Sequence, residues 1–332
     1  MVGMDRREFI GRTAAVLGAA ATGQLPPLLN RHALADTTTS PAGPTGVLRA
    51  GDTVILGRTG IRTSRLAIGT GTQICRQREM GQRGMLKLWR HGLDCGVRWW
   101  EVADMYGTHA LVKSTLRQVK REQVVITTKT LSKDYAGVRA DIERFRQEMV
   151  TDYIDVVLLH CLTDPDWTKK MRPAMDALSE AKQKGYVRAV GCSCHTFGAL
   201  TASRDEPWVD VQLARINPFA VIMDVSKPED VPKVASALQT MHGQGKGVYG
   251  MKILGEGRIQ GERIDESLRF ALRQQYLDGF VIGFRAIEEF DDILKRIERV
   301  QATTRKTESR SVIDTFLNMR KRRERRGADP GT

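Results

Sequence analysis

The chain alternates short apolar runs with longer amphipathic segments, and it does so eight times. Runs of four to six apolar residues are typical of buried parallel strands, whereas apolar residues three and four positions apart indicate helices. Gly96, Gly185, Gly245 and Gly279 follow helical segments and precede strands, where helices commonly end. Eight strand–helix units in about 250 residues predict an α/β fold, a TIM (β/α)8 barrel.

The hydrophobic pattern also sets the bounds of each predicted unit. The predicted strands and the helices that follow them are 66–69 with 84–95, 99–103 with 109–119, 124–128 with 138–149, 154–159 with 172–184, 187–191 with 197–202, 209–214 with 230–242, 247–251 with 264–275, and 279–282 with 287–300. Ahead of them, Val54–Leu56 and Ile61–Thr63 predict a short hairpin. A doubly wound sheet is the alternative fold, but no Gly-x-Gly-x-x-Gly turn opens a helix after the first strand.

Three successive predicted strands end in residues that can carry chemistry. Asp104 and Tyr106 follow the second strand, and their spacing of two would put both side chains on one side of an extended segment. Lys129 ends the third strand and His160 ends the fourth. Because the carboxyl ends of barrel strands meet at one rim, we expect these four side chains to converge there.

This constellation resembles the aldo-keto reductase family, from about Val54 to about Val300, and the opening segment Leu56–Gly71 is also similar to that family's start. The resemblance implies that the hairpin closes the bottom of the barrel. It also implies reduction of a carbonyl (an aldehyde, ketone or sugar) to an alcohol, with hydride supplied by a nicotinamide cofactor.

The resemblance assigns a role to each of the four residues. Tyr106 would be the general acid; a free phenol has a pKa of ~10, which a nearby ammonium at Lys129 would lower. Asp104 would keep Lys129 charged and oriented. His160 would donate a hydrogen bond to the substrate oxygen. Taken one by one, each residue could instead be a packing residue or a plain ion-pair partner.

The cofactor side of the resemblance is less complete. Cys194 stands where the family has an amide-binding Asn, and Ile293 stands near another absent Asn. Arg285 is the candidate for the adenosine 2′-phosphate, because a guanidinium forks onto phosphate oxygens, so NADP(H) is favoured over NAD. The predicted cofactor-binding residues are Gly69, Thr70, Ser193, Gln212, Met251, Leu254, Gly283 and Arg285.

The first 35 residues resemble a bacterial twin-arginine export signal. Arg6 and Arg7 precede an apolar run at 13–21, and Ala33–Ala35 offers small residues for cleavage. The run is too short to span a bilayer, which needs ~20 apolar residues. We therefore expect recognition by the twin-arginine machinery, a periplasmic or extracellular location, a flexible linker at 36–50, and a barrel domain at 51–303.

The formal net charge is +13, and the tail at 304–332 contains a strongly basic run, Arg320–Arg326. No nucleic-acid motif is present, so we interpret the chain as a basic enzyme. The tail is read as a short helix and a solvated end, in preference to a membrane-surface contact. The five cysteines have no disulfide or zinc spacing, so no metal is predicted.

Two alternatives remain open from the sequence. The altered amide position and the export signal would also suit a nucleotide-binding barrel that acts as a redox sensor or scaffold with little turnover. The weaker alternative is a metal-dependent barrel that uses Cys192, Cys194, His195 and His160.

Overall fold

The computed structural model describes residues 47–71 and 74–301. The predicted signal at 1–35, most of the predicted linker and the basic tail therefore lie outside the described residues. Residues 47–50 of the predicted linker are described, and Leu48 and Ala50 contact the barrel. The Leu48 N–H donates to Gln301 Oε1 (2.7 Å), and Ala50 is buried and accepts a hydrogen bond from the Leu66 N–H. The flexible linker therefore does not extend to residue 50.

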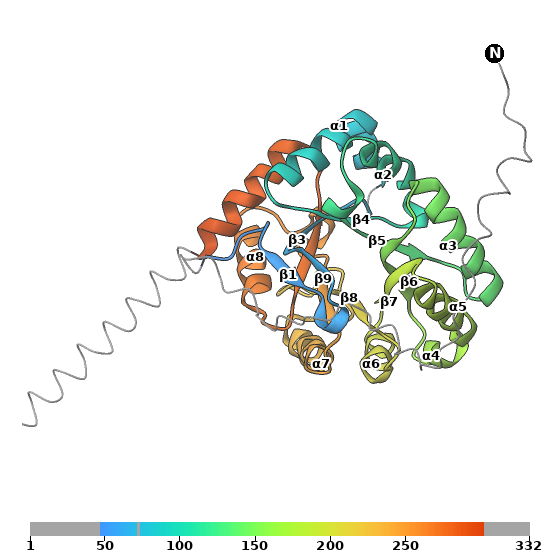
Figure 1. Ribbon diagram of the computed structural model, residues 1–332. Coiled ribbons are helices and arrows are strands. Elements are labelled where there is room, and N and C mark those ends of the chain that lie inside the picture. Colours follow the sequence, from blue (N-terminus) through green and yellow to red (C-terminus); the bar gives the residue numbers. More distant parts are fainter. Residues whose placement is uncertain (1–46, 72–73, 302–332) are drawn as a thin grey trace, which may run out of the picture. The chain divides into compact units, whose positions relative to one another are not determined.

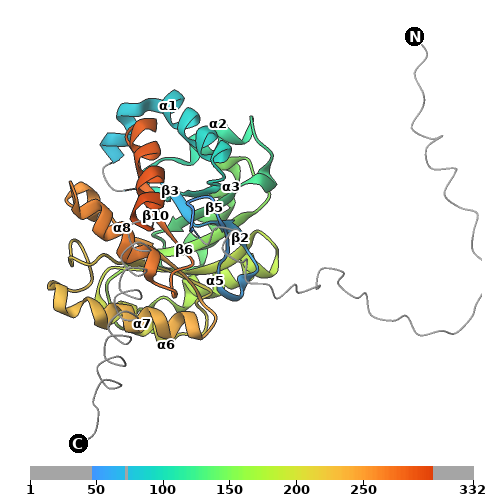
Figure 2. The ribbon, with the colours of Figure 1, turned by 90° about the vertical axis from the view of Figure 1, so that its left-hand side faces the viewer.

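Eight parallel strands form a closed barrel in the order β10-β3-β4-β5-β6-β7-β8-β9, which confirms the predicted TIM barrel (Figure 1). Figure 2 shows β3 and β10 side by side at the point of closure, where Leu66 pairs with Phe280. The strands are β3 Leu66–Gly69, β4 Trp99–Glu101, β5 Val125–Thr130, β6 Ile154–Leu162, β7 Val187–Cys194, β8 Val211–Arg215, β9 Gly247–Met251 and β10 Gly279–Gly283.

Helices surround the barrel and cover its outer face (Figure 1). They are α1 Ile74–Asp94, α2 His109–Leu116, α3 Tyr135–Met149, α4 Trp167–Lys170, α5 Arg172–Gln183, α6 Phe197–Asp205, α7 Val231–Gly243, α8 Arg263–Arg273 and a helix over 287–301. Gly81 interrupts α1 with a left-handed φ of 64°. Within the described part of the chain, none of the helices combines the length and apolar character that crossing a bilayer requires.

The hairpin closes the barrel at the amino-terminal ends of the strands, as predicted. It consists of β1 Thr53–Ile55 and β2 Arg62–Ser64, paired antiparallel. Leu56 and Ile61 lie between the two strands and are fully buried against the inner barrel core. The Gly57 N–H donates to Asp278, just before β10, and the Arg58 N–H donates to Gly245, just before β9. These contacts fix the plug to the bottom rim.

Side chains alternate between the barrel interior and the layer under the helices, because successive residues of a strand point to opposite faces. The interior cluster includes Trp99, Leu158, Leu213 and Tyr249. The outer cluster includes Trp100, which stacks on Trp89 of α1 with ring centroids 4.5 Å apart. Polar residues near the carboxyl ends of the strands therefore reach the cavity only from interior positions.

Candidate active site

The segment after β4 turns sharply instead of staying extended. Asp104–Tyr106 form a single 3-10 turn, η2, and Gly107 follows with a left-handed φ of 64°. In a 3-10 turn, residues two apart do not share a side. The prediction that Asp104 and Tyr106 point the same way is therefore wrong.

Lys129 is paired with Glu101, a residue that the sequence analysis did not single out. Trp99 points into the barrel, so the alternation also sends Glu101 inward. The Lys129 ammonium forms an ion pair with the Glu101 carboxylate and donates to the Val102 carbonyl oxygen (3.0 Å). Both side chains are buried. The signal that could have found Glu101 is a single acid inside an otherwise apolar strand.

Asp104 instead faces α3, outside the barrel. Both of its carboxylate oxygens accept hydrogen bonds from the Arg144 guanidinium (2.7 and 2.9 Å), and Arg144 also binds Asp141 and Glu148. The predicted Asp104–Lys129 ion pair is therefore wrong. Among the described residues, only Asp104, His109 and Glu148 bring three metal-ligand atoms close together. Arg144 already places a cation beside the two carboxylates.

Tyr106 lies against both Lys129 and His160. Lys129 Nζ is 4.8 Å from the centre of the Tyr106 ring, and the His160 ring meets the same ring edge-on at 5.6 Å between centroids. Burial, followed by the negative charge of Glu101, raises the pKa of the Tyr106 phenol. The expected lowering by Lys129 is therefore wrong for this state, since the ammonium faces the ring and is balanced by Glu101. The phenol is held protonated.

His160 is neutral across the physiological range. Burial and the nearby positive charges of Lys129, His195 and Lys252 lower its pKa to about 3. Its Nδ1 atom is buried and has no hydrogen-bond partner among the described residues. Burial also lowers the pKa of Lys129, against the effect of Glu101. The four groups that meet here are thus a protonated phenol, a neutral imidazole, and a buried ammonium with its carboxylate.

Gly71 leaves room for the phenol. A Cβ atom at this position would lie 2.5 Å from the Tyr106 ring carbon that carries the hydroxyl and 2.6 Å from the hydroxyl oxygen. Any larger residue would therefore push the ring away from its place. This contact ties the segment after β3 to the segment after β4 at the mouth of the barrel.

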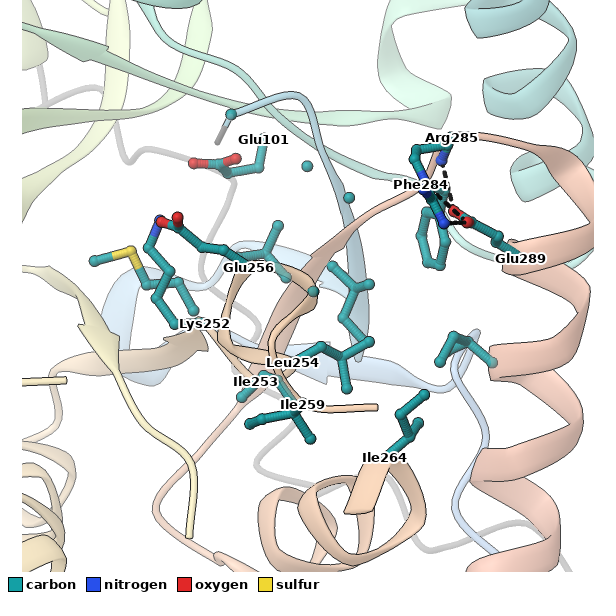
Figure 3. A pocket seen from close by; sticks show the side chains of 18 of the residues that line it. Glu101, Lys252, Ile253, Leu254, Glu256, Ile259, Ile264, Phe284, Arg285 and Glu289 are labelled. Atoms are coloured by element: carbon teal, nitrogen blue, oxygen red, sulfur yellow. Dashed lines mark hydrogen bonds and ion pairs between the residues drawn. The ribbon is translucent and has the colours of Figure 1, made fainter. Parts of the chain in front are cut away.

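A cavity of about 410 Å³ opens beside Tyr106 at the carboxyl ends of the strands. Glu101, Tyr106 and Met251 line it, and so do Arg285, Glu289 and Asp292. Figure 3 shows Glu101, Lys252 and Glu256 gathered on one side and Arg285 with Glu289 on the other. Between them lie the apolar side chains of Ile253, Leu254, Ile259 and Ile264.

Five of the eight predicted cofactor residues line this cavity: Gly69, Met251, Leu254, Gly283 and Arg285. Thr70 is buried and bonds to Thr108 and to the Glu101 carbonyl. Ser193 is also fully buried, and its hydroxyl accepts from the Cys161 N–H (2.9 Å).

Gln212 is turned away from the barrel interior, which corrects its predicted role as an amide-binding residue. Its neighbours Val211 and Leu213 point inward, so Gln212 points outward. Its side-chain oxygen accepts from Ser203 of α6 and from Cys192, and its nitrogen donates to the Leu213 carbonyl. Cys192 and Cys194 belong to the same outer layer. The metal alternative that joins them to His160 is therefore wrong.

Two further ion pairs, which were not predicted, each join two described residues that line the cavity. Lys252 follows Met251 and pairs with Glu256 (2.5 Å). Both residues have left-handed φ values, 61° and 57°, which side chains other than glycine rarely adopt. Such strain is often found at binding loops. The second pair is Arg285 with Glu289.

Comparison with known proteins supports the resemblance. The model of the aldo/keto reductase family matches residues 65–267. Two solved structures of a putative aldo-keto reductase from Pseudomonas aeruginosa are similar to this chain at 21% identity, with TM-scores of 0.64 and 0.61. Each match covers 77% of this chain, and the two matches cover 98% and 97% of the respective Pseudomonas chains. A holo-form aldo-keto reductase from Bacillus halodurans is similar at 15% identity and a TM-score of 0.60, covering 74% of this chain and 91% of that one. No curated protein sequence matches the chain.

Proposed function

Since the chain belongs to the aldo/keto reductase family, we propose that it is an oxidoreductase that reduces a small aldehyde, ketone or sugar carbonyl to an alcohol with a nicotinamide dinucleotide. The observation that carries this proposal is the position of Tyr106, which lines the cavity and contacts both Lys129 and His160. When bound, the cofactor supplies the hydride.

The cavity residues fit a dinucleotide in part. Met251 can cover a flat ring through its polarizable sulfur, and Gly69 and Gly283 line the cavity at the ends of β3 and β10 without adding a side chain to it. Leu254 and Arg285 would contact the remainder. The carboxamide finds neither Gln212 nor Cys194 facing it, because both belong to the outer layer. The cavity residues would therefore bind the cofactor mainly through the fit of its shape and through contacts with the nucleoside that lies farther from the reacting ring.

The protein's own part is to place the carbonyl and deliver one proton. The neutral His160 can donate an N–H hydrogen bond to the carbonyl oxygen, which fixes its position. As negative charge develops on that oxygen, the Tyr106 hydroxyl gives up its proton to it. The Lys129 ammonium stabilises the phenolate that remains, and Glu101 keeps the buried ammonium charged. Asp104 takes no part in this scheme.

The test is carbonyl-dependent oxidation of NADH or NADPH by the purified protein. Tyr106→Phe removes only the acidic hydroxyl, so turnover should fall by about 10²–10⁴-fold while nucleotide binding persists. Tyr186→Phe is the matched control, because that phenol stacks on Arg146 outside the barrel. Equal turnover in the wild type and Tyr106→Phe would contradict the proposal.

A second candidate is a nucleotide-binding barrel that acts as a redox sensor or scaffold. The observation that favours it is the outward orientation of Gln212 and Cys194, which leaves the carboxamide without its expected partners. Stoichiometric co-purification of a nucleotide, with no turnover over a broad carbonyl panel, would favour this candidate over the reductase.

We also propose export through the twin-arginine route, on the strength of Arg6 and Arg7 ahead of the apolar run. The measurement is cell fractionation. Replacing both arginines by lysine should leave the protein in the cytoplasm at full length, and an exported fraction equal to the wild type would contradict the proposal.

A further inference from the structure

The cavity has a second polar end, remote from Tyr106, that the proposed reaction does not use. Arg285, Glu289 and Asp292 line it, after β10 and on the first turns of the helix over 287–301. If the proposed function holds, the reacting ring of the dinucleotide lies beside Tyr106. An extended dinucleotide would then bring its far ribose toward Arg285 and Glu289, which lie on the side of the cavity away from Glu101 and Glu256 (Figure 3).

Arg285 is already held by a carboxylate there. The Arg285 backbone N–H donates to one oxygen of Glu289 (2.8 Å), and its guanidinium Nε donates to the other (2.8 Å). Both oxygens of Glu289 are thus engaged by residue 285. A phosphate on the ribose would compete with this carboxylate for the same guanidinium and would be repelled by it.

A second carboxylate adds to the repulsion. Asp292 lies three residues beyond Glu289, so both can occupy one side of the helix, and both line the cavity. Asp292 accepts a hydrogen bond from Arg296 Nε (2.6 Å), and the same arginine also donates to Asp265. Among the residues that the structure describes, the charged side chains at this end of the cavity are one guanidinium and two carboxylates.

Carboxylates suit a ribose that has a free 2′-hydroxyl, since they accept hydrogen bonds from hydroxyl groups. In dinucleotide sites generally, an acid binds the ribose hydroxyl of NAD and an arginine accommodates the phosphate of NADP. We propose that Glu289, by holding Arg285, makes this cavity select NAD(H) over NADP(H). This replaces the preference for NADP(H) that Arg285 alone indicated.

The experiment compares direct binding of NADH and NADPH to the purified full-length protein by calorimetric or fluorescence titration. The wild type should bind NADH about tenfold more tightly or better. Glu289→Gln keeps the size of the side chain and removes its charge, so the NADPH dissociation constant should fall about tenfold, with NADH changed less than about threefold. Adding Arg285→Ala to this variant should abolish the gain.

Glu288→Gln is the matched control, because Glu288 is the adjacent acid on the same helix and is not among the lining residues. It makes the same change in net charge and should leave the NADH to NADPH ratio as in the wild type. Tighter binding of NADPH by the wild type, or an unchanged ratio in Glu289→Gln, would overturn this inference and leave the proposed reductase standing. Failure of both dinucleotides to bind would overturn the proposed function as well.

Discussion

Glu101, at the end of β4, is the carboxylate that compensates the buried ammonium of Lys129. Removing one partner of a buried ion pair leaves the other charge unpaired in a low-dielectric interior. We therefore expect Glu101→Gln to lower the free energy of unfolding by roughly 3–5 kcal/mol and to impair turnover. Glu101→Asp, which keeps the charge, should recover part of both.

Asp104→Asn provides the contrast. Asp104 and Arg144 are partly exposed, and Arg144 keeps Asp141 and Glu148 as partners. The loss of stability should be less than about 1 kcal/mol, with turnover changed only slightly. Urea denaturation and carbonyl-dependent NADH oxidation measure both effects. Loss of turnover in Asp104→Asn with full turnover in Glu101→Gln would refute the assignment of Glu101, rather than Asp104, as the carboxylate partner of Lys129.

Two buried histidines predict how stability depends on pH. Burial, with nearby positive charge, lowers the pKa of His160 to about 3 and that of His195 to about 4. Between these values and about 6.5 the unfolded chain binds protons that the folded chain does not, so stability falls as the pH drops below 6.5. From pH 6.5 to 5 the loss is up to ~2 kcal/mol for each histidine.

His160→Asn should remove its share of that pH dependence in urea titrations at pH 6.5 and 5. His242 is a control of opposite sign, since its hydrogen bond with Asp278 raises its pKa. Its contribution is present below pH 6.5 and is lost as the pH rises through the folded-state value. His242→Asn should therefore make the acid loss steeper. A wild type equally stable at both pH values would contradict the buried neutral state.

At the scale of elements, β3 and β9 have the predicted bounds, Leu66–Gly69 and Gly247–Met251, because their apolar runs end at sharp changes of composition. β4 ends two residues earlier than predicted, since Asp104–Gly107 form a turn that apolar periodicity does not register. The outward orientation of Gln212 follows from its place between Val211 and Leu213, so alternation could have predicted it.

Other features of the site depend on elements that meet only in the folded chain. The Asp104–Arg144 pair joins a turn after β4 to α3, forty residues away. The position of Lys129 over the ring of Tyr106 depends on the register of β4 and β5. No local pattern in the sequence carries this information. The residue types at the strand ends therefore predicted that these side chains cluster, but not which of them form ion pairs with one another.

The contact between the segments after β3 and β4 gives a prediction for Gly71. In Gly71→Ala the added methyl group would displace the Tyr106 ring, so turnover should fall at least about tenfold with little change in thermal midpoint. Gly107→Ala is the matched control: a Cβ added there would meet no non-neighbouring atom of the described residues within 4 Å, but the left-handed φ makes the substitution strained. It should lower stability by about 1 kcal/mol and affect turnover less. The reverse ranking of turnover would contradict the packing argument.

At the scale of the whole barrel, the two ends of the described chain meet at the bottom rim. Leu48 and Gln301 exchange two hydrogen bonds through the Gln301 side-chain amide, 2.7 and 2.6 Å long. A circular permutant of residues 47–301, joined by a short Gly/Ser linker and opened at the exposed Gly185, should therefore fold. Because closing a short loop changes the free energy little, its thermal midpoint should lie within about 5 °C of the parent barrel. Failure of the permutant to reach native ellipticity would contradict this prediction.

The same pair of hydrogen bonds has a practical consequence. The cavity opens at the carboxyl ends of the strands, whereas Leu48 and Gln301 lie at the amino-terminal ends, where Ala50 also accepts from Leu66. A bead, electrode or carrier protein coupled near either position would lie at the amino-terminal end of the barrel, and the cavity at the opposite end would face the solvent. Such a tether would hold the molecule by two adjacent points and leave diffusion of reactants unobstructed.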